Sequence, residues 1–236
     1  HDIVFQEGLG SIADKVERIC HICHVIGDQL ELSKDLQDSI DRAAHRCKAD
    51  LVTQMVTELP GLQGVMGGYY AQVFKEMPEV SGAIRDHYKP RFDGDEFPET
   101  IIGTVIAIAD RIDTMVACFE NNAIPTGSRD PWGIRRSMIA IVRMVIAKRL
   151  NVNIVNLIEA ATLSLGKEVG ENTKQCIQFF NTRCETVFAE VGISHDIIQL
   201  FSNRLLASPF EIYNQANALI EVKKSNADQY QLLLET

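Results

Sequence analysis

The sequence predicts an all-α fold. Apolar residues recur every three or four positions along almost the whole chain, which is the period of an amphipathic helix. No alternating stretch is bounded by hairpin turns, and the seven prolines fall at breaks or first-turn positions, where a missing amide hydrogen costs little. The chain has 236 residues, of which 46% are hydrophobic and 23% charged. This composition is that of a globular protein with a sizeable core.

The helices can be placed in order along the chain. Ser11 caps a first helix over about 11–29, and Ser33 caps a second that runs to about residue 59, where Pro60 and Gly61 end it. The other helices are expected over about 61–76, 78–88, 98–120, 131–149, 153–164, 168–191, 194–206 and 211–222. Two polar loops, 89–98 and 121–131, interrupt them. The second is the better domain boundary, because the helical patterns on both sides are complete without it.

Charge and hydropathy argue against several classes of protein. The chain carries 23 Lys and Arg against 32 Asp and Glu, a net charge of −9 that argues against diffuse binding to nucleic acid or to a membrane surface. No apolar run approaches the length of a membrane span, and no signal-peptide pattern opens the chain. The first residue is His1 rather than Met, which suggests a piece of a longer protein. A cytoplasmic location is expected.

The cysteines are predicted to be reduced, buried thiols. The six cysteines are Cys20, Cys23, Cys47, Cys118, Cys176 and Cys184. Most of them lie inside apolar helical patterns, and their spacing is not that of a small secreted domain. Residues 20–24 read CHICH, which matches the C-x-x-C-H pattern of haem attachment and offers half of a zinc site. Covalent haem requires export, and no second CxxC or HxxxH is found. Neither metal nor haem is therefore expected here.

Basic residues are concentrated in one segment, the basic island 129–149. It contains one acidic residue, Asp130, and six basic ones: Arg129, Arg135, Arg136, Arg143, Lys148 and Arg149. The island is therefore +5, and the rest of the chain is −14. On a helix, Arg136 and Arg143 lie two turns apart on one face, and the opposite apolar stripe comprises Ile134, Met138, Ile141 and Val145. Such a face either pairs with acidic neighbours or contacts the phosphates of a nucleic acid, and the pattern alone does not separate these two.

Two carboxylates in apolar surroundings suggest a metal site. Asp50 and Asp110 are both predicted to lie mid-helix, where an unpaired charge is costly. Their layout resembles the HD superfamily of metal-dependent phosphohydrolases, whose ligands are a histidine, an adjacent His-Asp pair and a distant Asp. Here the pair is Ala49-Asp50, so the central imidazole is missing. His21, His24 and His87 are the histidines that could still contribute a ligand. A metal-dependent phosphohydrolase acting on a nucleotide or phosphodiester is therefore kept only as the alternative function.

Longer blocks resemble another family. They are residues 48–71 (KADLVTQMVTELPGLQGVMGGYYA), 83–92 (AIRDHYKPRF), 108–115 (IADRIDTM), 125–136 (PTGSRDPWGIRR) and 8–19 (GLGSIADKVERI). In this order they are similar to the bacterial glycyl-tRNA synthetase β subunit, and the resemblance covers nearly the whole chain. Trp132 and Arg111 depart from the usual Phe and Lys but preserve size or charge.

The resemblance implies a role in a larger enzyme. Such synthetases are α2β2 heterotetramers in which the α subunit holds the adenylation and glycyl-transfer site and uses ATP and Mg²⁺. The β subunit binds tRNA(Gly). For this chain it implies a degenerate HD-like helical domain at 1–125, a helical continuation at 126–207 and the truncated start of an anticodon-binding domain at 208–236. No catalytic residue, cofactor, resident metal or membrane contact is expected in this chain.

The resemblance also points to residues for tRNA contact. The basic island becomes the first candidate for a surface that follows the tRNA backbone. Second candidates are Lys89, Arg91 and the glycine-rich stretch 63–70, in which Tyr69 and Tyr70 offer rings for stacking on an unpaired base. Tight helix packing explains the same glycines equally well. Asp50, Asp110 and Asp113 are expected to remain as structural relics, hydrogen-bonded to Arg or Lys.

Overall fold

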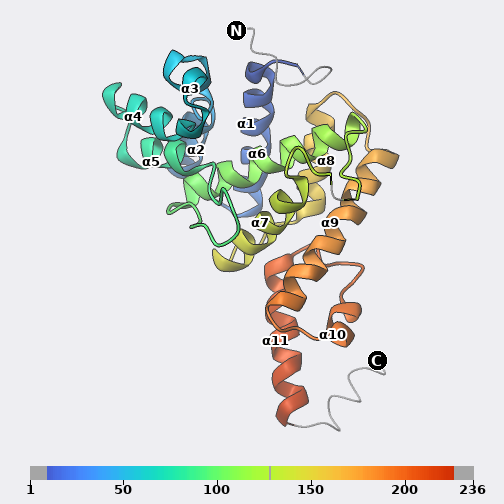
Figure 1. Ribbon diagram of the computed structural model, residues 1–236. Coiled ribbons are helices and arrows are strands. Elements are labelled where there is room, and N and C mark those ends of the chain that lie inside the picture. The colour runs from blue at the N-terminus through green and yellow to red at the C-terminus, as the bar shows by residue number, and fades with distance from the viewer. Residues whose placement is uncertain (1–9, 128, 226–236) are drawn as a thin grey trace.

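The computed structural model describes residues 10–127 and 129–225, and every helix or strand assigned within these ranges is a helix (Figure 1). The all-α prediction is confirmed. The remaining residues, which include His1 and the end of the predicted third domain, lie outside the described residues. The division at 125 and 207 stays a prediction.

The helices follow the predicted order. The α-helices are α1 (Ile12–Gln29), α2 (Lys34–Ala44), α3 (Gln54–Glu58), α4 (Val65–Val73), α5 (Pro78–Asp86), α6 (Ile101–Glu120), α7 (Ile134–Ala147), α8 (Ile154–Ser164), α9 (Glu171–Glu190), α10 (His195–Leu200) and α11 (Pro209–Ser225). Two 3₁₀ helices, η1 (Ala49–Val52) and η2 (Pro60–Leu62), flank α3. Ser11 caps α1 as predicted, in a capping box with Asp14.

The helix predicted over 33–59 is wrong beyond Ala44. There α2 ends, and the chain continues through turns, η1 and the short α3. The Asp50 carboxylate accepts hydrogen bonds from the backbone N–H groups of Gly64 and Gly67, at 2.7 and 3.0 Å, which ties η1 to the start of α4. A continuous helix would carry Asp50 away from these partners. Asp50 is therefore buried but not mid-helix.

The helix expected over 194–206 is likewise shorter than predicted. It ends at Leu200 and is followed by turns. The side-chain amide of Asn181 donates to the carbonyl oxygen of Ser202 at 3.0 Å. This bond gives that carbonyl a partner on α9.

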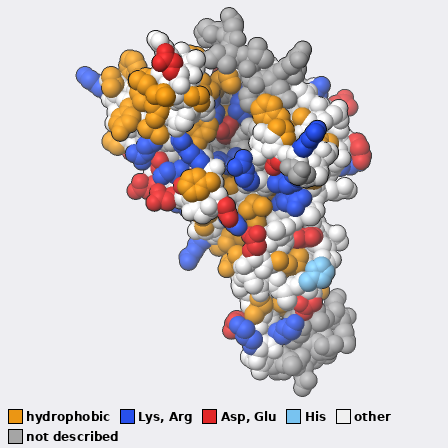
Figure 2. All heavy atoms as spheres, in the orientation of Figure 1, with side chains coloured by type: hydrophobic (Ala, Val, Ile, Leu, Met, Phe, Trp, Pro, Cys, Tyr) orange, Lys and Arg blue, Asp and Glu red, His pale blue; other side chains and the backbone are white. Residues whose placement is uncertain are grey.

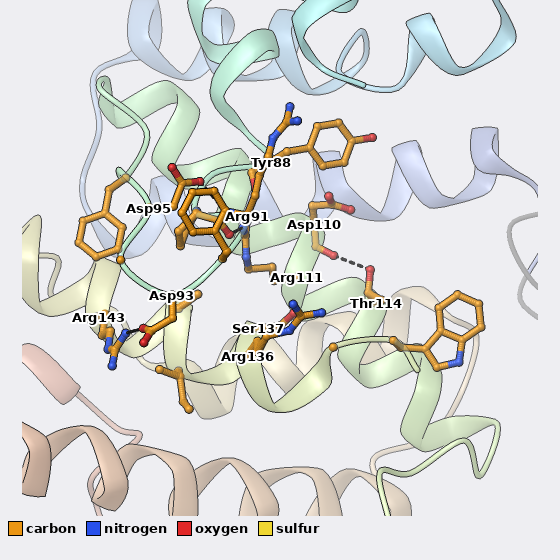
Figure 3. A pocket seen from close by; sticks show the side chains of 18 of the residues that line it. Tyr88, Arg91, Asp93, Asp95, Asp110, Arg111, Thr114, Arg136, Ser137 and Arg143 are labelled. Atoms are coloured by element: carbon orange, nitrogen blue, oxygen red, sulfur yellow. Dashed lines mark hydrogen bonds and ion pairs between the residues drawn. The ribbon is translucent and has the colours of Figure 1, made fainter. Parts of the chain in front are cut away.

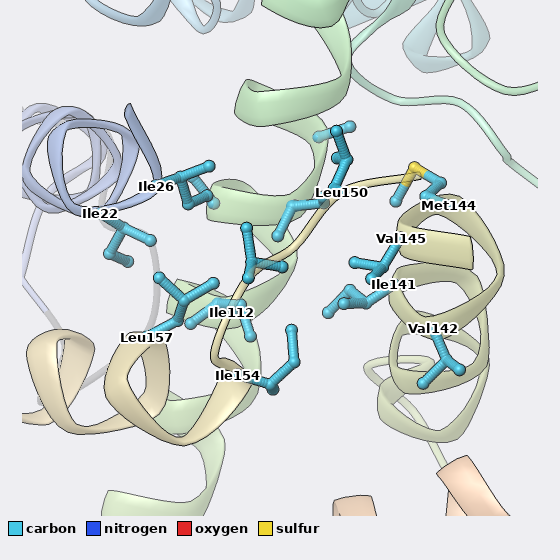
Figure 4. Packing of buried hydrophobic residues seen from close by; sticks show 14 of the residues in the cluster. Ile22, Ile26, Ile112, Ile141, Val142, Met144, Val145, Leu150, Ile154 and Leu157 are labelled. Atoms are coloured by element: carbon cyan, nitrogen blue, oxygen red, sulfur yellow. The ribbon is translucent and has the colours of Figure 1, made fainter. Parts of the chain in front are cut away.

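The long helix α6 is the centre of the core. All but four of its 20 residues are buried, and it contacts α1, α2, α5, α7, α8 and α9. Figure 4 shows apolar side chains from α1, α6, α7 and α8 meeting beside it. The stripe predicted on α7 is confirmed, because Ile134, Met138, Ile141 and Val145 are at most 1% exposed. The opposite, basic face of α7 is thereby turned away from the core.

The six cysteines are all buried and none forms a disulfide, as predicted. Burial raises the pKa of Cys47 to about 12 and that of Cys118 to about 11. Both groups are therefore neutral thiols at physiological pH.

Helices α1–α8 form a body from which α9, α10 and α11 extend as an arm (Figure 1). One end of α9 packs against α7 and α8, and α10 and α11 pack together farther out. Within the described ranges, no helix combines the length and hydropathy needed to cross a bilayer.

Exposed apolar side chains gather on the α3–α4 side of the body, visible at the upper left of Figure 2. They are Val52, Met55, Leu59, Tyr69, Val73, Phe74 and Met77. Phe74 is 80% exposed and Val73 75%. A concentration of this kind is typical of a contact surface.

Candidate functional site

A buried ion cluster joins α6 to α1 and to the turn after α2. The ammonium group of Lys15 lies 2.9 Å from both the Asp110 and the Asp113 carboxylates. The ammonium group of Lys48 lies 2.7 Å from the other Asp110 oxygen, and the Arg18 guanidinium pairs with Asp113 at 2.5 Å. All five side chains are at most 12% exposed. Each carboxylate is thus held between two cations away from water.

These partners keep the cluster ionised. Burial by itself raises the pKa of Asp110, but Lys15 and Lys48 overcome this effect and hold the pKa well below its usual value. Burial would likewise lower the pKa of Lys15, yet Asp110 and Asp113 raise it. Asp110 is therefore a carboxylate at any physiological pH.

His87 completes the cluster as a neutral acceptor. Lys48 Nζ donates to His87 Nε2 at 2.9 Å, and His87 Nδ1 donates to the carbonyl oxygen of Ile84 at 2.7 Å. Burial, followed by the Lys48 charge, holds the pKa of His87 well below its ordinary value of 6.5. The two hydrogen bonds require the tautomer that carries its proton on Nδ1.

The residues of this cluster do not fit a divalent metal. A metal ion needs several converging donor atoms, but each Asp110 oxygen faces a lysine ammonium group. Within the described part of the chain, neither Asp50 nor Asp110 belongs to a group of three His, Cys, Asp or Glu donors. The expected Lys and Arg partners are present at Asp110 and Asp113. For Asp50 that expectation was wrong, because its partners are backbone amides.

Because His87 is buried and neutral, the free energy of unfolding should fall in mild acid. Unfolding restores its ordinary pKa of 6.5, so below this pH the unfolded state takes up a proton that the folded state does not. The stability present above pH 6.5 is then lost as the pH falls, by up to about 1.4 kcal/mol per pH unit. Urea unfolding of His87→Gln should show a flatter dependence than the parent between about pH 6.5 and 5. Equal slopes for both proteins would assign the acid sensitivity to other groups.

A pocket of about 570 Å³ lies next to the ion cluster. It is bounded by the 89–98 loop on one side and by α7 on the other, with Asp110 and Arg111 of α6 at its back. Figure 3 shows Arg91, Arg136 and Arg143 arranged around it. The pocket thus brings the predicted loop arginine together with two arginines of the basic island.

The pocket arginines differ in their partners. Arg143 pairs with Asp93 and, at 2.8 Å, with Glu190. Arg111 donates to backbone carbonyls, among them those of Tyr88 and Pro90 at 3.0 Å. Arg91 also donates to carbonyls, those of residues 61 and 63. None of these carbonyl bonds neutralises the guanidinium charge.

Arg136 is the most available of the pocket arginines. Its side chain is exposed and makes no hydrogen bond or ion pair with the described residues. The guanidinium lies against the backbone of Gly133, where a Cβ atom would come within 3.0 Å of it. Gly133 also has a φ of +64°, which favours glycine. The turn before α7 therefore makes room for the Arg136 side chain.

Comparison with known proteins places the chain in a family. The family model described as glycyl-tRNA synthetase beta subunit matches residues 1–202. The chain belongs to this family. It is 37% identical over 229 residues to the glycine–tRNA ligase beta subunit of Syntrophomonas wolfei, which covers 95% of this chain and 33% of that protein. The corresponding protein of Desulforamulus reducens is 40% identical over 202 residues, 83% of this chain and 29% of its own length. The chain thus spans about a third of these relatives.

In this member of the β-subunit family, the other predicted contact residues lie apart from the pocket. Lys89 pairs with Asp86 and Glu96. Arg135 lies over the Phe179 ring, and Lys148 donates to the carbonyl oxygen of Glu99. Among these residues away from the pocket, Tyr70 is half-buried, and the exposed ones are Arg129, Arg149, Tyr69 and the relic position Ala49.

The glycines beside Tyr69 and Tyr70 serve close packing in this structure. A Cβ atom at Gly67 would lie 2.9 Å from Ile84 and 3.2 Å from the Asp50 carboxylate, and one at Gly68 would lie 2.8 Å from the Arg85 side chain. These contacts favour the packing explanation of the glycine-rich stretch. Whether the tyrosines stack on a base stays a prediction.

The basic half of the ion cluster was not predicted from the sequence. Lys15 and Arg18 are three residues apart on α1, so they share one face of that helix, and both are buried. Two basic residues on an otherwise apolar face signal carboxylates on the helix packed against it. The same reasoning would have paired them with Asp110 and Asp113.

Proposed function

We propose that this chain binds tRNA(Gly) and positions it for aminoacylation at the active site of a separate α subunit. It supplies no catalytic group of its own. In this proposal the assembly is an α2β2 glycine–tRNA ligase of the cytoplasm, and its α subunits use the ATP and Mg²⁺. Support comes from the relatives, which carry the name glycine–tRNA ligase beta subunit.

The observation that carries the proposal is the placement of α7. Its apolar stripe is buried, so Arg136 and Arg143 face the pocket, with Arg91 on the opposite wall. Figure 2 shows Lys and Arg side chains gathered across the middle of this face. Arginine guanidinium groups form paired hydrogen bonds with phosphate oxygens. In an acidic protein, such a local basic face directs a polyanion to one place.

The partners of the three pocket arginines determine how available each guanidinium is to a phosphate. Arg136 is available to a phosphate as it stands, whereas Arg143 must first give up Asp93 and Glu190. Arg91 holds the backbone of residues 61 and 63, so its replacement disturbs the pocket wall as well as its charge. The largest direct effect on binding is therefore expected at Arg136.

Titration with labelled tRNA(Gly) at increasing salt tests the proposal. Arg136→Glu should weaken binding by about tenfold or more and reduce the slope of log affinity against log salt by about one. Lys34→Glu, the same charge change at an exposed position on α2, is the matched control and should bind as the parent does. Equal affinities for Arg136→Glu and Lys34→Glu at every salt concentration would contradict the proposal.

A further inference from the structure

We infer a binding site for a divalent transition metal of the zinc class between α1 and α2. Each helix presents two ligand-type side chains four residues apart, Cys20 with His24 and Asp41 with His45. Residues at this spacing lie on one face of a helix. The two helices pack against each other (Figure 1), so the two pairs meet across the contact.

Three of the donor atoms, from Cys20, Asp41 and His45, lie within 4.8 Å of one another, as a tetrahedral ion requires. Cys20 Sγ lies 3.3 Å from His45 Nδ1, and Asp41 Oδ1 lies 3.4 Å from the same nitrogen. His24 Nε2 lies 3.3 Å from Asp41 Oδ1 but outside this group of three, so its side chain must turn toward the ion to become the fourth ligand. Zinc bonds of about 2.0–2.3 Å give tetrahedral edges of about 3.3–3.8 Å between ligand atoms. The edges that join His45 to Cys20 and to Asp41 are therefore already in place.

An unsatisfied oxygen points to the same ligand. Asp41 Oδ1 is shielded from solvent and accepts no hydrogen bond of good geometry within the described structure; its nearest nitrogens are those of His24 and His45, at 3.3 and 3.4 Å. Buried carboxylate oxygens rarely lack a donor, and a bound cation is one explanation when they do. The Cys20 thiol is also buried, whereas the other three side chains are 39 to 53% exposed. An ion from solvent can therefore reach the oxygen and the sulfur.

Binding requires two proton movements. His45 Nδ1 lies 2.9 Å from the backbone carbonyl of Asp41, so its proton must transfer to Nε2 before the nitrogen can coordinate. Glu17, 3.9 Å from Nε2, must approach by a side-chain movement to accept a hydrogen bond there, as carboxylates commonly do for metal-bound histidine. The Cys20 thiol loses its proton to solvent, so one proton is released per ion bound.

The donor set selects the metal. One sulfur, two imidazole nitrogens and one carboxylate oxygen suit zinc or cobalt and exclude the all-oxygen ions magnesium and calcium. No metal is expected here from the sequence, because the chain contains no second CxxC or HxxxH. The missing half is instead the D-x-x-x-H pair of α2. Cys23 and His21 of the CHICH segment take no part.

Cobalt absorption tests the site directly, because tetrahedral cobalt with a thiolate ligand gives intense visible bands and a near-ultraviolet charge-transfer band. The 236-residue chain should bind one equivalent of Co²⁺ with both features and lose them when Zn²⁺ is added. Cys20→Ser should abolish the charge-transfer band, and His45→Ala should weaken binding at least about tenfold. His21→Ala, an exposed histidine on α1 outside the site, is the control and should behave as the parent does.

Several results would overturn the inference. They are less than one equivalent bound at saturating cobalt, a charge-transfer band that persists in Cys20→Ser, or an equal loss in His21→Ala. Far-UV circular dichroism establishes whether each variant is folded. If Cys20→Ser does not fold, His45→Ala decides the question, since its imidazole is on the surface.

Discussion

Asp110→Ala should lower the free energy of unfolding by about 3–5 kcal/mol, because breaking a buried ion pair leaves an uncompensated charge. The substitution takes the carboxylate away from both Lys15 and Lys48, whose side chains are only 4% exposed. Lys15 keeps Asp113, but Lys48 is left with His87 and the Tyr88 ring. Urea unfolding monitored by circular dichroism measures the loss.

A paired substitution separates charge from packing. Asp110→Asn combined with Lys48→Met removes both charges while nearly preserving volume, and such replacements are often neutral or stabilising. The double variant should therefore lose less stability than Asp110→Ala. A loss below about 1 kcal/mol in Asp110→Ala would contradict the account, because it would mean that water already reaches these charges.

The cluster is connected to the pocket, because Asp110 also lines it. Its neighbour Arg111 fixes the backbone at Tyr88 and Pro90, where the 89–98 loop begins. Helix α6 therefore positions the loop that carries Arg91. These hydrogen bonds, with those of Arg91 to residues 61 and 63, hold the Arg91 guanidinium at the pocket wall.

The helices could be predicted from the sequence because their signals are local. The Ser11 cap and the α7 stripe depend on residues within a few positions of each other, and both are confirmed. The path of residues 45–62 depends on Asp50, whose partners Gly64 and Gly67 are 14 and 17 residues away. The spacing of apolar residues along a helix does not reveal hydrogen bonds between residues this far apart in the sequence.

In the candidate site too, features set by neighbouring residues could be predicted, and contacts between distant residues could not. The basic island and its apolar stripe are visible in the sequence, so a basic face on α7 was predictable. The neutralisation of Arg143 was not, because Asp93 and Glu190 are 50 and 47 residues distant. The D-x-x-x-H half of the inferred metal site was not predicted for a related reason. Only the packing of α1 on α2 brings this pair close to Cys20.

The second large effect is expected in the assembled enzyme. If this chain positions tRNA and the α subunit performs the chemistry, Arg136→Glu should impair charging of tRNA without impairing activation of glycine. Loss of a hydrogen bond between charged partners costs about 1.5–3 kcal/mol, which corresponds to about a 10–100-fold fall in kcat/KM for tRNA(Gly). Lys34→Glu serves again as the control of equal charge.

The most direct test compares these two reactions in one preparation. The β subunit carrying Arg136→Glu is reconstituted with its α subunit, and ATP–pyrophosphate exchange and aminoacylation are measured side by side. We predict unchanged exchange with a 10–100-fold loss of kcat/KM for tRNA, about 1.5–3 kcal/mol of transition-state stabilisation. Unchanged aminoacylation, or an equal loss in both reactions, would contradict a role for this surface in binding tRNA.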